Sequence, residues 1–221
     1  MSPLSLMPHL HHRHFAAGWR SRLATIALLM GVASGYAHAQ MTDPNAAARA
    51  QHMATQSCAV CHGPQGQNRD LAFPRLAGQN AEYLAKQLAA FQHNRRTSST
   101  MAHSANPLTP DEMLALGQYY ERQSTAHTPS TQLQLAARGQ YLYHTGNPAT
   151  GVPACASCHG PQALGQAHLP RLASQSPTYL LEQLRQFAQG GRTNDQGQMH
   201  ATTRTMSQDE MAAVAEYLGS R

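Results

Sequence analysis

The four cysteines of this 221-residue chain form the clearest chemical pattern in its sequence. They fall into two Cys-x-x-Cys-His motifs, which begin at Cys58 and Cys155. Two thiols three residues apart lie on one helical turn and can reach both vinyl groups of one porphyrin, and a histidine directly after them is typical of c-type haem attachment. The motifs therefore predict two covalent haem c groups with bound iron. The cysteines that attach them are Cys58, Cys61, Cys155 and Cys158, and the proximal iron ligands are His62 and His159.

Three other uses of four cysteines compete with haem: a four-thiolate zinc site, redox-active dithiols and structural disulfides. A zinc site would place about 15 to 20 residues between the two pairs, whereas Cys61 and Cys155 are much farther apart. Thioredoxin-like dithiols accompany a strand-helix pattern, which is missing here. None of the three explains a histidine after both pairs, so haem is favoured.

The second axial ligand of each iron is expected to be histidine or methionine, the common choices in electron-transfer haem proteins. The candidates are Met101, His103, Met199 and His200. Each methionine lies eight residues before the hydroxyl residue that begins the last predicted helix of its half, whereas each histidine aligns with an alanine. This register favours Met101 and Met199. The methionines on or beside the helical pattern are assigned to the core: Met113, Met206 and Met211.

Prolines and arginines after each motif are candidates for the surroundings of the haem. Pro74 and Pro170 could each offer a backbone carbonyl to the proximal histidine, because a metal-bound imidazole usually donates its other ring N–H. Ordinary turn prolines are the alternative. Arg75 and Arg171 could bind haem propionates through the guanidinium fork, with solvated arginines as the alternative. Histidines without a partner in the repeat are assigned to the surface or loops: His52, His93, His127, His144 and His168.

The elements that must position these residues occur twice, at an offset of 96 to 98 residues. Residues 83–91 and 179–187 place apolar side chains on one helical face. Thr109 and Ser207 are each followed three residues later by glutamate, a capping box that predicts a helix. These helices are expected to run to about Arg122 and Leu218.

No segment alternates with the period of a strand, so the fold is predicted to be all-α. Two domains, residues 40–123 and 133–221, are expected on either side of a polar linker, residues 124–132. Each domain is small enough that a buried porphyrin would add substantially to its core.

Residues 1–39 have the features of an export signal. Three arginines precede an apolar stretch that is too short to span a bilayer, and Ala37-His38-Ala39 provides a cleavage site. Removing these arginines lowers the excess of basic over acidic residues from five to two. We therefore expect an exported protein with no nucleic-acid footprint and at most peripheral membrane association.

The order of helix, Cys-x-x-Cys-His-Gly, Pro-Arg-Leu-Ala, Tyr-Leu-x-x-Gln-Leu, methionine and capped helix occurs twice after the export signal. Over nearly the whole mature chain, this order resembles the dihaem cytochrome c4 family. The resemblance implies two tandem class I cytochrome c domains, each wrapped around one haem with histidine and methionine ligands. It also implies periplasmic electron transfer with redox partners such as a quinol-oxidising complex, a dehydrogenase or a terminal oxidase.

An iron with both axial positions filled exchanges single electrons and has no open site for a substrate, which favours a carrier of electrons between respiratory partners over an enzyme. No catalytic residue is predicted. The alternatives are a haem-bearing subunit of a larger dehydrogenase or oxidase complex, and a dihaem enzyme of the peroxidase or thiosulfate-oxidising type. Such an enzyme needs an open iron or an unusual ligand, and there is no fifth cysteine to supply a thiolate.

Overall fold

The computed structural model describes residues 42–68, 70 and 72–221. The predicted signal peptide, residues 1–39, lies outside the described residues. Over the described ranges the regular elements are helices, and extended backbone is paired only at two isolated bridges in loops. The all-α prediction is therefore confirmed. None of the helices in this part of the chain is long and apolar enough to cross a membrane.

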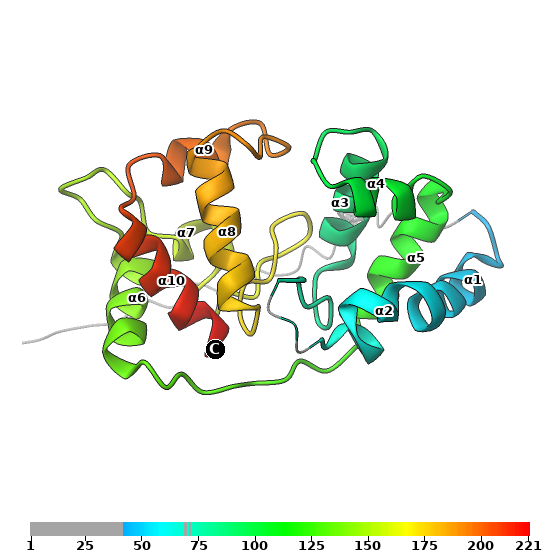
Figure 1. Cartoon of the computed structure of the whole chain (residues 1–221), viewed down its shortest axis with the longest axis horizontal. Coiled ribbons are helices and arrows are strands. Elements are labelled where there is room, and N and C mark those ends of the chain that lie inside the picture. Colours follow the sequence, from blue (N-terminus) through cyan, green and yellow to red (C-terminus); the bar gives the residue numbers. More distant parts are fainter. Residues whose placement is uncertain (1–41, 69, 71) are drawn as a thin grey trace, which may run out of the picture. The chain divides into compact units, whose positions relative to one another are not determined.

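The first half of the described chain is built from five α-helices (Figure 1). They are α1 (Ala46–Met53), α2 (Ala59–His62), α3 (Ala81–Gln92), α4 (Ser99–Ala105) and α5 (Pro110–Glu121). A π-helical segment, Ala54–Cys58, joins α1 directly to α2, and a short 3-10 turn, Pro64–Gly66, follows α2.

The second half repeats the pattern with five α-helices. They are α6 (Leu133–Thr145), α7 (Ala156–His159), α8 (Pro177–Ala188), α9 (Gln198–Thr203) and α10 (Gln208–Gly219). The non-helical stretch between α5 and α6 includes the predicted linker, residues 124–132. The domain boundaries themselves stay a prediction.

Both predicted capping boxes are present and fix the start of the last helix in each half. In α5, Glu112 N–H donates to Thr109 Oγ1 over 3.2 Å, and Thr109 N–H donates back to the Glu112 carboxylate over 2.9 Å. Ser207 and Glu210 make the same pair at α10, at 3.2 and 2.8 Å. The backbone N–H groups of the first turn are thus satisfied where the sequence pattern placed them.

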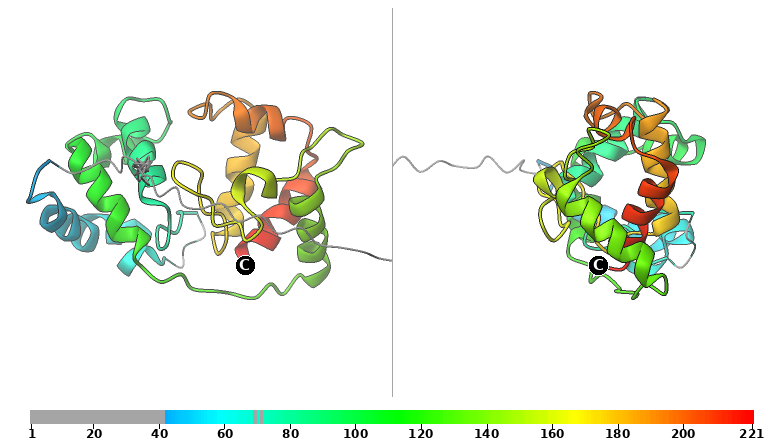
Figure 2. Two further views of the ribbon diagram at one scale, coloured as in Figure 1. Left: turned by 180° about the vertical axis from the view of Figure 1, so that it is seen from behind. Right: turned by 90° about the vertical axis from the view of Figure 1, so that its left-hand side faces the viewer.

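Each half has its own apolar core. In the first half α5 packs against α1 and α3, and in the second half α10 packs against α6 and α8. The views in Figure 2 show α6 and α10, coloured green and red, crossing in contact. Gly139 permits this crossing, since a Cβ there would lie 1.9 Å from the Ala213 carbonyl oxygen. The three methionines assigned to the core are buried as predicted: Met113, Met206 and Met211.

The segment before the cysteine motif differs between the two halves. In the first half the helix continues without interruption from α1 to α2. In the second half α6 ends at Thr145, where Gly146 adopts a left-handed φ of 70°. A loop then leads to α7, and its closely packed backbone leaves no room for a Cβ at Gly146, which would lie 2.2 Å from the Val152 carbonyl oxygen.

Candidate haem-binding sites

The two cysteine motifs lie on short helical turns that end directly after the histidine. The last helical residues are His62 in α2 and His159 in α7, and the glycines that follow have left-handed φ angles of 75° and 78°. A Cβ at Gly63 would lie 2.8 Å from the backbone of Asn68. Glycine therefore allows the chain to leave the helix at once, and at Gly63 it also allows the close approach of the Asn68 backbone.

The four cysteines are unpaired thiols. Three are half-buried and Cys158 is exposed. Burial raises the pKa of Cys155 to about 11 and also raises the pKa of Cys58. A redox-active dithiol needs the opposite shift, because the thiolate is the reactive form. The environment of these cysteines thus argues against a catalytic dithiol.

The two histidines are buried and share one hydrogen-bond arrangement. His62 and His159 are each 7% exposed. Nδ1 lies 3.0 Å from the Pro74 carbonyl oxygen in the first half and 3.3 Å from the Pro170 carbonyl oxygen in the second. A carbonyl can only accept, so Nδ1 carries the proton and Nε2 keeps its lone pair.

Burial lowers the pKa of both imidazoles and outweighs the opposite effect of the proline carbonyls. Each ring is therefore held neutral, with its orientation fixed through Nδ1. This is the state that a metal-ligating histidine requires.

The loops that carry these prolines are held alike. Leu76 N–H donates to the Gly66 carbonyl over 2.9 Å, and Leu172 N–H donates to the Ala163 carbonyl over 2.8 Å. Gly66 and Ala163 both adopt left-handed φ angles, 76° and 57°. The second half thus tolerates an alanine in a conformation that glycine adopts without strain.

The predicted distal ligands lie on two short helices that sequence patterning did not reveal. Met101 in α4 is half-buried and packs against the same core cluster as Cys58 and Leu76. Met199 in α9 is also half-buried, and its N–H donates to the Asp195 carboxylate over 2.6 Å.

The competing histidines differ in exposure. His103 is exposed, whereas His200 is half-buried with Nδ1 2.9 Å from the Phe187 carbonyl oxygen. The choice of methionine over histidine rests on the repeat and stays a prediction.

The arginines predicted to bind propionates make contacts with protein carbonyls. Arg75 donates from Nη1 to the Ser174 carbonyl over 2.7 Å. Arg171 donates from Nε to the Ala173 carbonyl over 3.2 Å. Both side chains are half-buried, and their contact with propionates stays a prediction.

A second pair of arginines, Arg96 and Arg192, was missed by sequence reasoning although the two residues align in the repeat. Arg96 donates to the Tyr179 hydroxyl over 2.7 Å and to Gln183 Oε1 over 2.9 Å, both in the other half. Arg192 mirrors this with the Tyr83 hydroxyl at 3.1 Å and Gln87 Oε1 at 3.0 Å. Each guanidinium also stacks on an aromatic ring of its own half, Phe91 or Phe187.

Arg192 is the buried member of this arginine cluster, and Arg96 is half-buried. Arg192 is 6% exposed, and within residues 42–68, 70 and 72–221 neither guanidinium forms an ion pair with a carboxylate. Burial raises the pKa of the Tyr83 hydroxyl, but the charges of Arg192 and Arg96 outweigh this effect and lower the pKa below its usual value. A buried guanidinium without an ion-pair partner is costly unless an anion joins it, and haem propionates are anions of this kind.

A buried tyrosine hydroxyl lies beside the first cysteine motif. Tyr120 is 3% exposed, and its hydroxyl has no hydrogen bond within the described residues. Burial, with the adjacent Cys58 thiol, raises the pKa of Tyr120 above its usual value. The two pairs of neighbouring free thiols, the neutral buried imidazoles, the arginines without an ion-pair partner and this hydroxyl together fit a covalently attached haem.

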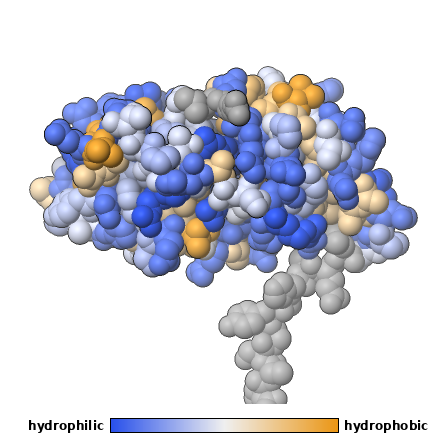
Figure 3. All heavy atoms as spheres, turned by 90° about the horizontal axis from the view of Figure 1, so that it is seen from below, coloured by the Kyte–Doolittle hydropathy of each residue, from blue (hydrophilic) through white to orange (hydrophobic). Residues whose placement is uncertain are grey.

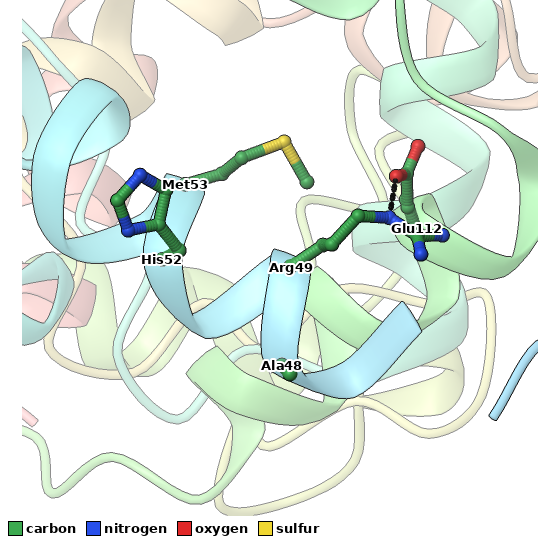
Figure 4. Close-up of a pocket in the computed structure, with 5 residues that line it drawn as sticks. All are labelled: Ala48, Arg49, His52, Met53 and Glu112. Atoms are coloured by element: carbon green, nitrogen blue, oxygen red, sulfur yellow. Dashed lines mark hydrogen bonds and ion pairs between the residues drawn. The ribbon is translucent and has the colours of Figure 1, made fainter. Parts of the chain in front are cut away.

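One surface depression lies apart from these residues. Figure 4 shows it between α1 and α5 in the first half. Its lining residues are Ala48, Arg49, His52, Met53 and Glu112. Arg49 Nε donates to Glu112 over 2.6 Å, so this charge is already paired. None of the predicted haem residues lines the depression, and we assign it no function.

Comparisons with known proteins identify the family of this chain. The sequence matches the cytochrome c family over residues 47–123 and 136–221. Cytochrome c4 of Thiocapsa roseopersicina is 42% identical over 81% of this chain and 93% of that protein. The thiosulfate dehydrogenase electron acceptor of Thiomonas intermedia is 35% identical over 75% of this chain and 78% of that protein. The crystal structure of reduced cytochrome c4 from Pseudomonas stutzeri has a TM-score of 0.74 at 29% identity, covering 79% of this chain and 97% of that one.

Two cytochrome c regions, each with its own haem motif, define a dihaem c-type cytochrome. The chain belongs to the cytochrome c4 family. Its two haem c groups and its role as an electron carrier rather than an enzyme, both predicted from the sequence, are therefore confirmed. Covalent haem accounts for the paired motifs, so the zinc, dithiol and disulfide alternatives are set aside.

Proposed function

We propose that this protein carries single electrons between redox proteins of the periplasm. In the proposal His62 and Met101 are the axial ligands of the first iron, and His159 and Met199 those of the second. The observation that carries it is the pair of buried, neutral imidazoles, each with Nδ1–H given to a proline carbonyl and Nε2 left for iron. Residues 1–39 direct export in this account.

The chain's residues decide how each iron is held. Cys58 and Cys61 attach one haem through thioethers, and Cys155 and Cys158 the other. The bound haem supplies one-electron chemistry. A thioether ligand raises the potential relative to a second imidazole, so methionine ligation suits a carrier at the high-potential end of a respiratory chain.

Two pairs of arginines offset the charge of the propionates in this account. Arg96 and Arg192 are the stronger candidates, because neither forms an ion pair with a carboxylate among the described residues and Arg192 is buried. Arg75 and Arg171 are placed beside the proximal prolines and are the second pair in this proposal. Positive charge beside the haem disfavours the more positively charged ferric state and raises the potential.

The partners are other redox proteins that dock briefly. Figure 3 shows one face that is mostly hydrophilic, with small, separate apolar areas. Such a surface suits weak, wet interfaces that allow repeated turnover. The donor would be a quinol-oxidising complex or a dehydrogenase, and the acceptor a terminal oxidase.

A more specific role is electron acceptor of a thiosulfate dehydrogenase. The relative from Thiomonas intermedia and a 38% identical protein of Stutzerimonas stutzeri are named as such acceptors. The thiosulfate dehydrogenase TsdBA of Marichromatium purpuratum is 35% identical with a TM-score of 0.67, although this chain matches only 36% of that one. This role would make the chain the electron-accepting partner in a larger complex.

Spectra of the purified protein test the ligand assignment. We expect two haems per chain, both low-spin, with the weak long-wavelength charge-transfer band of ferric methionine ligation in the oxidised protein. Two low-spin haems without that band would mean that histidine, and not methionine, is the second iron ligand. One high-spin haem would mean an open iron and would favour the enzyme alternative. If the protein is the electron acceptor of a thiosulfate dehydrogenase, that enzyme should reduce its haems when thiosulfate is supplied. Haems that stay oxidised would exclude the acceptor role.

A further inference from the structure

Two buried glutamines contact the opposite half of the molecule in the same way. Gln79 and Gln175 are 5% and 6% exposed and align in the internal repeat. Gln79 Oε1 accepts the backbone N–H of Arg171 over 2.8 Å, and Gln79 Nε2 donates to the Arg171 carbonyl over 2.8 Å. Gln175 makes the same two bonds with the backbone of Arg75, both at 2.8 Å.

The orientation of each side-chain amide is fixed by a third bond. Gln79 Oε1 also accepts the Asn80 N–H over 3.0 Å, and Gln175 Oε1 accepts the Ser176 N–H over 2.8 Å. Two backbone donors therefore meet each glutamine oxygen, so the oxygen and nitrogen of each amide cannot exchange places without losing all three bonds.

The peptide groups that the glutamines hold are the ones that bind the proximal histidines. The N–H of Arg75 and the carbonyl of Pro74 belong to one planar peptide unit. The N–H side bonds to Gln175, and the carbonyl side accepts from His62 Nδ1 over 3.0 Å. In the second half, the peptide unit of Pro170 and Arg171 lies in the same way between Gln79 and His159.

We infer that Gln79 and Gln175 are crossed positioning residues for the two irons. Gln79 orients the peptide group that accepts the His159 Nδ1–H, and Gln175 does the same for His62. Each half thereby sets the proximal hydrogen bond of the haem in the other half. The inference rests on the proposed ligand role of the two histidines.

The physical effect follows from polarisation of the shared peptide group. Donation of its N–H to glutamine increases the negative charge on its carbonyl oxygen and makes that oxygen a better acceptor. A better acceptor makes the proximal imidazole more basic, which stabilises ferric iron. Removing one glutamine should therefore weaken the histidine hydrogen bond and raise the potential of the haem in the opposite half.

The variants Gln79→Met and Gln175→Met test this in the full haem-loaded protein, since methionine keeps the length of the side chain and loses the amide. NMR of the reduced protein, with backbone assignment of both histidines, measures exchange of each Nδ1–H with solvent. In Gln79→Met we expect exchange about fivefold faster at His159 and unchanged at His62. We also expect a raised potential for the second haem alone. Gln175→Met should reverse the pattern.

Two controls separate positioning from general loosening. Tyr179→Phe removes a hydrogen bond between the halves that touches neither proline loop, and it should leave both Nδ1–H exchange rates unchanged. The opposite half of each variant is the second control: His62 in Gln79→Met and His159 in Gln175→Met should exchange as in the wild type. If Gln79→Met is poorly folded, Gln175→Met still tests the crossed pattern, since it should change exchange at His62 and not at His159.

An effect of Gln79→Met on His62, an equal effect on both histidines, or no effect in a folded variant would overturn the inference. Failure of the ligand assignment itself is visible in the wild-type protein. Non-ligating histidines would lack the large upfield ring-current shifts of protons held against the haem.

Discussion

Gly139 of α6 and Ala213 of α10 lie in backbone contact, so that a Cβ on Gly139 would lie 1.9 Å from the Ala213 carbonyl oxygen. Because the clash is with backbone, a larger residue forces the two helices apart. Gly139→Ala should lower the free energy of unfolding of the second half by about 2 kcal/mol. Denaturant unfolding followed by haem absorbance measures this. Gly191→Ala is the control, since a Cβ there meets nothing closer than 3.6 Å, and equal stability of the two variants would contradict the packing argument.

The pH dependence of stability should contain a contribution from the carboxylate of the second capping box. Burial raises the pKa of Glu210, but hydrogen bonds from Asn147 and Ser207 outweigh this effect and hold the pKa below its ordinary value of 4.5. A carboxyl group whose pKa is lower in the folded than in the unfolded state stabilises the fold at any pH above its unfolded-state pKa. This contribution is lost as the pH falls through the folded-state pKa.

Glu210→Gln should therefore flatten the fall in stability below about pH 4.5. Thermal unfolding measured between neutral and acid pH tests this. Glu216→Gln, on the same helix, is the matched control. If the stability of Glu210→Gln and of the wild type fell in parallel with pH, Glu210 would not contribute to the loss of stability in acid.

The distal ligands can be separated by single variants. Met101→Ala should open only the first haem and Met199→Ala only the second, each giving a high-spin haem or a substitute histidine ligand with a lower potential. Met113→Leu and Met211→Leu replace buried core methionines and should leave both haem spectra unchanged. Low-spin spectra and potentials like those of the wild type in both alanine variants would exclude Met101 and Met199 as ligands.

The arginine cluster should raise both potentials. Arg192 bonds to groups of both halves and is 6% exposed. Arg192→Gln removes a poorly screened positive charge, so we expect both potentials to fall. Arg122→Gln makes the same charge change at an exposed position and should have little effect. If the two variants shift the potentials equally, the charge of Arg192 affects the haems no more than an exposed charge does, and the account of the cluster is wrong.

Sequence patterning predicted the helices that have strong local signals. The apolar faces of α3 and α8 and the capping boxes of α5 and α10 depend on residues within a few positions of each other, so the pattern is visible in one segment. The helices that carry Met101 and Met199 were missed because they are short and mostly polar.

The contacts between the halves could not be predicted in the same way. Gln79 and Gln175 align in the repeat, but their partners are 92 and 100 residues away in the sequence. Only the fold shows that each glutamine meets the backbone beside the other half's proline. The Arg96 and Arg192 cluster is hidden for the same reason, since its hydroxyl acceptors, Tyr179 and Tyr83, lie on the opposite half's α8 and α3.

A redox titration combined with carbon monoxide exposure tests the central claim, a dihaem carrier with both irons fully ligated. We predict that the native protein takes up and returns two electrons reversibly, and that the reduced form binds little carbon monoxide because histidine and methionine occupy both axial positions of each iron. Stoichiometric carbon monoxide binding at one haem of undamaged protein, together with substrate turnover by the isolated chain, would contradict the account.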